Sequence, residues 1–405
     1  MFDKFFNIPV HLSKIIEFKT AGVVPPNKVI FGFQSTNTVG YEAAKYGDRV
    51  MIVSDTTMQS IGVTDSINEI LRNHDLEVDL FTSVEPEPHM ETVENLYDQC
   101  KQSESSVIIG VGGGSVMDVS KLAAQSVGEG NRPIEYVKGS TSPIKDGLPL
   151  ILIPTTSGTG SEVSPYTVMM IGDRKQFLSS DFYYPDMAII DPALTITMPS
   201  EVTASTGIDA LSHAIESIMH QNANDFTYTF ARTAIEMISR YLRSAVMNGE
   251  DLEARYYMSM AATMAMLALS TSGGLYAHSV SFVLTKYNPT PHGVGCGLGL
   301  PYLMDYNRPL IKEKLIKIAV AFGERTYLYS DEDVAKKSVF SVIDIMKDCR
   351  LPVALKDCEG FKEEDLTDMA ELMVNDYPRP MNPRKMTYED AKKYWRNIWF
   401  GTFNW

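Results

Sequence analysis

The stretch VIIGVGGGSVMDVSK, residues 107–121, decides the fold. It passes from an apolar run through three consecutive glycines to a helical pattern that begins at Ser115. Glycine lets the backbone approach a ligand closely, and the first turn of a helix offers unpaired N–H groups and the positive end of its dipole. The stretch therefore predicts a strand, a turn and a helix. The turn is either a phosphate-binding loop or a plain connection, since its spacing is not G-x-G-x-x-G.

The residues on either side of this stretch repeat the same order of elements. Up to residue 199, short β-branched runs alternate with helical stretches, and six segments have strand character: 27–33, 48–55, 77–83, 105–115, 148–156 and 186–191. Such alternation is typical of a parallel sheet with helices on both faces. We therefore predict that residues 1–199 form an α/β nucleotide-binding domain.

The strand signals end after Pro199. Helical patterns then dominate, at 207–220, 226–247, 253–270, 308–327 and 331–349. We predict that residues 200–405 form an all-helical domain, and that a ligand binds in the cleft between the two domains. All three tryptophans, Trp395, Trp399 and Trp405, lie near the C-terminus. Large aromatic side chains mostly become buried, so we expect this segment to pack in the core.

The amino-acid composition excludes some classes of function. The 405 residues carry 51 acidic and 36 Lys and Arg side chains, for a formal charge of −15. This balance argues against general binding of nucleic acid or of an anionic membrane, since both require a basic surface. The four cysteines are scattered and are expected to be reduced thiols. We find neither a signal peptide nor a membrane-spanning run, so the expected location is the cytoplasm.

The segment GIDALSHAIESIMH, residues 207–220, carries polar side chains on one stripe of an otherwise apolar helix. Asp209 and His213 are four residues apart, and Glu216 and His220 continue the stripe. Isoleucine and leucine on the opposite face make the helix amphipathic. The stripe is either a solvated face or the first part of a metal site.

Two later histidines are further candidates for the metal interpretation of this stripe. His278 lies in YAHSV and His292 in NPTPHGVG, where Gly293 is expected to free the backbone after the histidine. One aspartate and three neutral imidazoles suit a divalent ion such as Fe²⁺ or Zn²⁺ with an open coordination position.

Two other segments are candidates for cofactor binding. Asp55 ends a predicted strand, where an acid either binds the ribose hydroxyls of NAD or caps the following helix. The loop PTTSGTGSE, residues 154–162, follows another strand and is rich in hydroxyls and glycines.

Taken together, GGGSVMDVSK, PTTSGTGSE, GIDALSHAIE and PTPHGVG…LPYLMDYN closely resemble the motifs of the iron-containing (group III) alcohol dehydrogenases. The resemblance extends from about Asn27 to the segment MNPRKMT. It implies a Rossmann-like domain followed by a helical domain, a dehydroquinate synthase-like fold. It also implies NAD, a divalent metal with Fe²⁺ favoured over Zn²⁺, and a homo-oligomer, dimeric or larger.

The resemblance also assigns residues. Its metal and catalytic positions fall on Asp209, His213, His278 and His292. Its cofactor positions fall on Asp55, Gly112, Gly113, Gly114, Ser115, Asp118, Thr155, Thr156, Ser157, Gly160 and Lys175. This chain departs from the family at two places: Phe282 stands where many members have a further histidine, and Glu87 stands where asparagine is frequent. Phe282 and Tyr166 are expected to line a partly apolar substrate pocket.

The implied activity is reversible hydride transfer between NAD(H) and a small primary alcohol or aldehyde, including ω-functionalised ones. Two alternatives share the fold: a glycerol-type polyol dehydrogenase and a lyase related to dehydroquinate synthase. The lyase requires clustered basic residues for a phosphorylated acid, and the sequence shows no such cluster beside the ligand histidines. A binding module that retains nucleotide and metal without turnover is a third alternative, which NADH oxidation with aldehydes would test.

Overall fold

The first part of the chain forms a parallel sheet, as predicted. The computed structural model describes residue 26, residues 28–172 and residues 174–403. Six strands lie side by side, all parallel, in the order β1 (Lys28–Phe31), β8 (Met187–Ile190), β5 (Leu150–Pro154), β4 (Val107–Gly112), β2 (Arg49–Val53) and β3 (Glu77–Phe81). β4, the strand of the opening stretch, is buried at every position.

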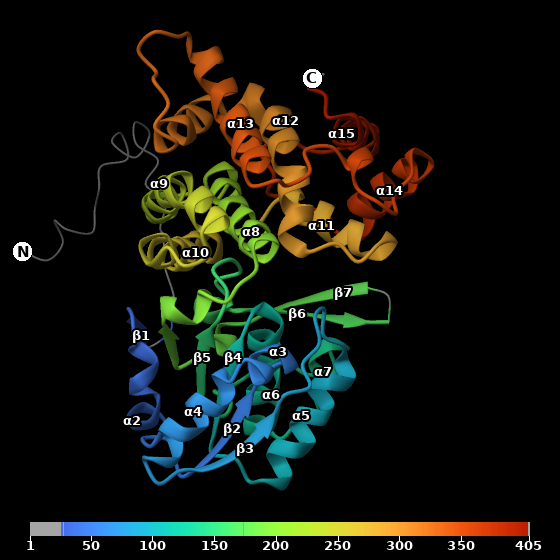
Figure 1. The fold of residues 1–405 in the computed structure, drawn as a ribbon. Coiled ribbons are helices and arrows are strands. Elements are labelled where there is room, and N and C mark those ends of the chain that lie inside the picture. Colours follow the sequence, from blue (N-terminus) through green and yellow to red (C-terminus); the bar gives the residue numbers. More distant parts are fainter. Residues whose placement is uncertain (1–25, 27, 173, 404–405) are drawn as a thin grey trace, which may run out of the picture.

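Helices cover both faces of this sheet (Figure 1). They are α2 (Val39–Ala43), α3 (Thr56–Ser60), α4 (Val63–Arg72), α5 (Met90–Gln102), α6 (Gly114–Glu129) and α7 (Pro133–Val137). Alternate strand residues face opposite sides: Ile108 packs with α5 and α6, whereas Ile109 packs with α2 and α4. This period of two explains why the central strands are apolar at every position.

An antiparallel hairpin, β6 (Tyr166–Ile171) and β7 (Arg174–Ser179), was not predicted. It lies outside the six-stranded sheet and extends beneath the helical domain, close to α11 (Figure 1). Lys121 on α6 holds its base, because the buried ammonium donates hydrogen bonds to Ser161, Ser164 and the carbonyl of Tyr166. At its other end, Arg174 of β7 pairs with Asp376 in the helical domain, so the hairpin contacts both parts of the chain.

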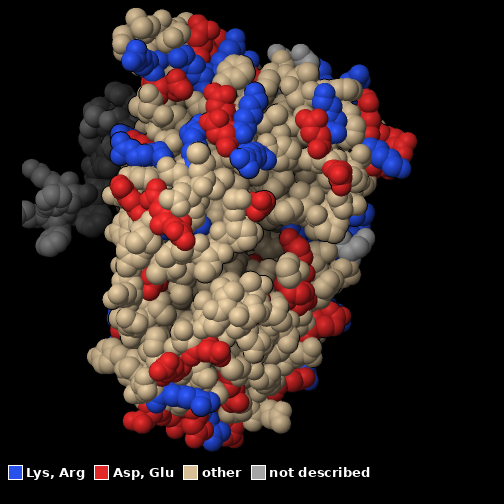
Figure 2. Space-filling view, viewed as in Figure 1, with Lys and Arg blue, Asp and Glu red and all other residues tan. Residues whose placement is uncertain are grey.

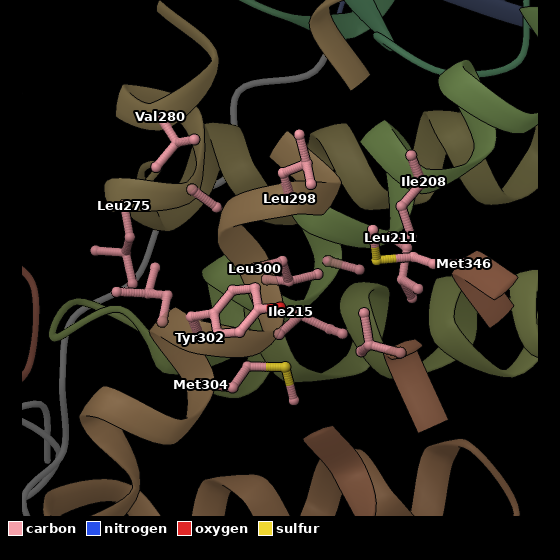
Figure 3. Close-up of a cluster of buried hydrophobic side chains, with 14 of the residues drawn as sticks. Ile208, Leu211, Ile215, Leu275, Val280, Leu298, Leu300, Tyr302, Met304 and Met346 are labelled. Atoms are coloured by element: carbon pink, nitrogen blue, oxygen red, sulfur yellow. The ribbon is translucent and has the colours of Figure 1, made fainter. Parts of the chain in front are cut away.

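After β8 the chain is helical. The helices are α8 (Ser200–Met219), α9 (Asp225–Met247), α10 (Leu252–Ser272), α11 (Tyr276–Tyr287), α12 (His292–Ala321), α13 (Asp331–Asp348), α14 (Leu366–Asp376) and α15 (Tyr388–Phe400). One apolar core joins all of them, and Figure 3 shows part of it, with Ile208, Leu211 and Ile215 of α8 among the labelled side chains. None of the single helices described is long and apolar enough to cross a membrane, although the bent pair α10 and α11 passes that test by length and composition.

Helix α8 is not a surface helix with one solvated face. Every residue from Gly207 to His220 is buried. The apolar face packs in the core, while on the polar stripe Glu216 contacts His278 of α11 and Asp209 lies near His292 of α12. The solvated-face interpretation of this stripe is therefore wrong, since its polar groups must find partners inside the protein.

Helix α12 begins much earlier than predicted, at His292, and the predicted helix at 308–327 is its second part beyond a kink at Ile311. Gly293 does not free the backbone but lies in the first helical turn. A Cβ there would come within 1.9 Å of the carbonyl oxygen of Ser205 on α8. Glycine is required because the two helices touch.

The C-terminal helix α15 packs on α12 and α14, and its Trp395 is completely buried. Trp399 is partly buried and Trp405 lies outside the described residues. We expect Trp395→Ala to lower the free energy of unfolding by about 3–5 kcal/mol, because it opens a large cavity in the core. Tyr388→Ala on the same helix, at a residue that is 37 % exposed, should cost about 1 kcal/mol or less. Denaturant unfolding measures both, and equal losses would contradict the packing role of Trp395.

Candidate metal and cofactor site

Three helices bring four potential metal ligands together. Asp209 lies on α8, His278 on α11, and His292 and Cys296 in the first turns of α12; one ligand atom from each lies within 4.8 Å of the others. Nε2 of His292 is 3.7 Å from Oδ1 of Asp209 and 3.6 Å from Sγ of Cys296. These separations equal the edges of a tetrahedron around an ion with bonds of about 2.0–2.3 Å.

Buried atoms without partners fit a cation at this position. Oδ1 of Asp209 and Nε2 of His278 are both buried and make no hydrogen bond within the described structure. Buried polar atoms are nearly always satisfied, so such a pair at one point requires an explanation. A divalent ion would satisfy both at once, and the donor set of carboxylate and imidazole suits it.

His213, the fourth predicted ligand, lies at the edge of the cluster. Its Nε2 is 3.7 Å from Oδ1 of Asp209, and its ring stacks on that of His278 with centroids 4.9 Å apart. Burial lowers the pKa of His213 to about 4 and that of His292 to about 3. Both imidazoles are therefore neutral at pH 7, which is the form that binds a metal.

Glu216 orients the His278 ring of the cluster. Its carboxylate is completely buried, contacts Nδ1 of His278, and accepts hydrogen bonds from the N–H groups of Leu275 at 3.1 Å and Ala277 at 2.8 Å. Burial alone would raise the pKa of Glu216, but His278 and these N–H groups lower it below its usual value. The charged carboxylate fixes the proton of His278 on Nδ1 and turns Nε2 toward the other ligands.

Cys296 is a member of the cluster that the sequence did not assign to it. It was expected only to be a reduced thiol, and all four cysteines are indeed free. Cys296 follows His292 by four residues, and this spacing would have placed both side chains on one face of a helix. The spacing is informative only if the segment is recognised as a helix. The glycines around Cys296 argued against a helix there.

The glycine turn and the loop at 154–162 lie side by side at the ends of neighbouring strands. Gly113 caps α6, and the N–H of Thr155 donates to the carbonyl of Gly112 at 3.0 Å. A Cβ added to Gly113 would lie 3.5 Å from Thr156, which is an ordinary contact. A Cβ added to Gly114 would lie only 2.8 Å from Thr159. The first N–H groups of α6 have no carbonyl partner within the helix, which suits a phosphate.

The other predicted cofactor residues have structural partners. Asp118 accepts from Ser161 Oγ and from the N–H of Val168, and burial raises its pKa. Ser157 contacts Ser259 on α10, and Gly160 has φ of 62° in close contact with Met266. Asp118 therefore anchors the hairpin, and the loop packs against the helical domain.

Asp55 caps helix α3. Its Oδ1 accepts from the N–H groups of Thr57 at 2.8 Å and Met58 at 3.0 Å, so the capping interpretation is confirmed. The role in binding ribose is compatible with this cap, since a carboxylate has a second oxygen. That role stays a prediction.

A cavity of about 490 Å³ joins the metal cluster to the glycine turn. Ser115 and Asp118 line one end, and Asp209, His213, His278 and His292 line the other. Figure 2 shows a hollow near the middle of the molecule with acidic side chains beside it. Tyr166 and Phe282, which were predicted to line a substrate pocket, and Lys175, which was predicted to lie near the cofactor, all line this cavity.

Two cations lie near the histidines, although the sequence showed no basic cluster there. Nζ of Lys175 lies 5.6 Å and Cζ of Arg379 lies 5.9 Å from the centroid of the Phe282 ring. That ring is itself 5.8 Å from the ring of His292. The cations come from distant segments, so local sequence could not reveal them.

Comparison with protein families agrees with this geometry. Residues 26–192 match the model of the iron-containing alcohol dehydrogenases, and residues 203–399 match the C-terminal model of the same family. The chain belongs to the iron-containing alcohol dehydrogenase family. Its fold and the four motifs that suggested the resemblance are thereby confirmed.

Relatives within the iron-containing alcohol dehydrogenases span nearly the whole chain. Long-chain-alcohol dehydrogenase 1 of Geobacillus thermodenitrificans is 34% identical over 82% of this chain and 85% of its own length. The crystal structure of a 1,3-propanediol oxidoreductase is 30% identical, with a TM-score of 0.90 over 94% of this chain and 100% of that one. The sulfoacetaldehyde reductase of Bifidobacterium kashiwanohense, solved in complex with NAD+, is 27% identical, with a TM-score of 0.85 over 94% and 99%.

The contact between Glu216 and His278 gives a testable prediction. We expect Glu216→Gln to weaken metal binding about 10- to 100-fold, because the amide no longer fixes His278 as the carboxylate does. Competition between the protein and a chelator for Co²⁺ or Zn²⁺ measures the affinity. Glu201→Gln, an exposed acid in the first turn of α8, is the control and should bind the metal as tightly as the unmodified protein.

Proposed function

We propose that this member of the iron-containing alcohol dehydrogenases oxidises small primary alcohols and reduces the corresponding aldehydes with NAD(H) at a divalent metal. The observation that carries the proposal is the pair of unpartnered buried ligand atoms, Oδ1 of Asp209 and Nε2 of His278, at the end of a cavity that also reaches the glycine turn. Reduction of aldehydes by the metal-loaded protein with NADH tests it.

The proposal gives each side chain a role. Asp209, His213, His278 and His292 would hold the metal, and Cys296 lies next to them. When bound, a divalent ion supplies a Lewis acid for the alcohol oxygen, and NAD+ supplies the hydride acceptor. Glu216 keeps His278 in the required orientation, while the Phe282 ring makes this part of the cavity apolar.

The reaction then balances. The alcohol loses a hydride, which is one proton and two electrons, from the carbon that bears the hydroxyl, and NAD+ becomes NADH. The hydroxyl proton is released separately. Because the side chain of Phe282 cannot carry a proton, we propose that the released proton would leave through water, through the ribose hydroxyls of a bound cofactor or through His220, which also lines the cavity.

Several finer assignments belong to the same proposal. We assign the cofactor to Asp55, to the glycine turn with Asp118, to the loop at Thr155, Thr156, Ser157 and Gly160, and to Lys175. Fe²⁺ is the proposed metal, and Zn²⁺ is the alternative that the adjacent thiol favours. We further propose a domain boundary near Pro199, a cytoplasmic location and a homo-oligomer. The exposed edge strand β1, where Val29 is 42% exposed, supports an oligomer.

Removal of a proposed ligand is the most direct test. We expect His278→Ala and His292→Ala each to lose tight metal binding and activity while they keep the fold, because the Lewis acid and one anchor are removed together. Metal analysis and circular dichroism on the same samples measure this. His74→Ala removes an exposed histidine of the first domain and should change neither. Full metal occupancy in both ligand variants would overturn the assignment.

Asp55 should decide the choice of cofactor. We expect a preference for NADH over NADPH that Asp55→Asn narrows about tenfold or more, because the carboxylate binds ribose hydroxyls and repels a 2′-phosphate. Asparagine caps a helix as well as aspartate, so this variant changes the charge and preserves the cap of α3. The ratio of kcat/KM for the two cofactors is the measurement. Equal use of both by the unmodified enzyme would refute the role.

A further inference from the structure

Arg379 is a charged side chain in the cavity that the proposed chemistry does not use. It follows α14, and its guanidinium lies over the face of the Phe282 ring at 5.9 Å. Its Nε donates to Oγ of Ser279 at 3.0 Å, and that hydroxyl in turn donates to the carbonyl of Tyr377. These contacts fix the plane of the guanidinium and leave both Nη atoms available.

No carboxylate in the described part of the chain lies within 4.0 Å of this guanidinium, and its Nη atoms make no hydrogen bond there. The acids that line the cavity are committed elsewhere. Glu87 pairs with Lys175 at 2.8 Å, Asp118 accepts from Ser161 and Val168, and Asp209 lies in the metal cluster. Arg379 is therefore the cation of this cavity that lacks a paired acid.

A partly buried cation that is not paired with a carboxylate is unfavourable unless a ligand supplies the partner. Burial lowers the pKa of Arg379, and the carboxylate of Glu216 opposes this shift from a distance. Glu216 does not pair with the guanidinium and instead binds His278 and two backbone N–H groups. The guanidinium stays protonated at neutral pH. Its two free Nη atoms present the planar donor pair that binds a carboxylate or sulfonate with two hydrogen bonds.

A second donor lies nearby. Tyr166 lines the same cavity, and its hydroxyl makes no hydrogen bond to the described residues. Burial raises the pKa of Tyr166 to about 12, so the hydroxyl keeps its proton and can donate to an anion. Arg379 is close enough to act on that pKa in the opposite direction.

We propose that the substrate carries an anionic group at the end opposite its reacting carbon, and that Arg379, with Tyr166, binds this group. The reacting end would lie at the metal cluster, since His292 and Arg379 both flank the Phe282 ring, at 5.8 and 5.9 Å. Because both groups lie against one ring, they are at most about 12 Å apart. A substrate of about two to four carbons between its two polar ends can bridge such a distance when each end is held by a contact of about 2–3 Å. Apolar side chains such as Leu269 and Met381 would cover its methylene groups.

This inference rests on the proposed dehydrogenase activity and selects its substrate class, ω-carboxylated or ω-sulfonated alcohols and aldehydes. The test compares 4-oxobutanoate with its neutral methyl ester as substrates of the metal-loaded enzyme with NADH. We expect the unmodified enzyme to prefer the anion. Arg379→Gln should lower kcat/KM for 4-oxobutanoate about 10- to 100-fold, mainly through KM, and change kcat/KM for the ester less than about threefold.

Two further variants separate charge, geometry and folding. Arg379→Lys keeps the charge but loses the paired donors, so it should recover part of the preference for the anion. Arg174→Gln is the matched control, because it removes a nearby cation whose side chain is 54 % exposed and pairs with Asp376 at the surface. Arg174→Gln should leave kcat/KM for both substrates unchanged. A change as large as that of Arg379→Gln would mean that general charge, and not this site, attracts the anion.

Binding without turnover distinguishes the two proposals. Calorimetry should detect 4-hydroxybutanoate binding to the metal-loaded, cofactor-free protein and at least tenfold weaker binding to Arg379→Gln. If the unmodified enzyme reduces both aldehydes equally well, the anion site is refuted and the dehydrogenase proposal stands. If 4-hydroxybutanoate binding depends on Arg379 but neither aldehyde is reduced, the anion site is supported and the dehydrogenase proposal fails.

Discussion

The site depends on how closely α12 approaches its neighbours. A Cβ on Gly293 would lie 1.9 Å from a carbonyl oxygen of α8, and one on Gly295 would lie 2.6 Å from the Cα of Ser281 on α11. Each glycine in a helix costs about 1 kcal/mol of helix propensity relative to alanine. The chain accepts this loss because ligands on three different helices must meet within the few ångströms that one ion spans. The glycines that lower the helix propensity of this segment are the residues that let α12 come close enough to its neighbours to form the metal site.

The parallel sheet was predictable because its information is local. A buried parallel strand is apolar at every position, and each is followed by a helical pattern, so the six strands were recognised from short segments alone. The hairpin β6–β7 was missed, since its second strand, RKQFLS, is largely polar and exposed. The first half of α12 was missed for the opposite reason: tertiary packing overrides the low propensity of four glycines and Pro301.

The candidate site was predictable only as far as its motifs are contiguous. The family resemblance assigned Asp209, His213, His278 and His292, but no sequence pattern gives the partner of a side chain across the fold. Glu216 was noticed on the stripe of α8, yet its role depends on His278, which lies 62 residues later. Arg379 likewise acts through Ser279, 100 residues earlier. Residues that position ligands or bind substrate from distant segments become visible only when the helices are in place.

The hairpin β6–β7 contacts both halves of the molecule, and this limits how the halves can move. Lys175 pairs with Glu87 on the sheet side, while Arg174 pairs with Asp376 at the end of α14. A hinge that opens the cavity to exchange cofactor must break one of these links. The Arg174 pair is exposed, and such pairs stabilise by only about 0–1 kcal/mol, whereas Lys175 is almost fully buried. The hairpin would therefore travel with the sheet and carry one wall of the cavity away from the metal ligands.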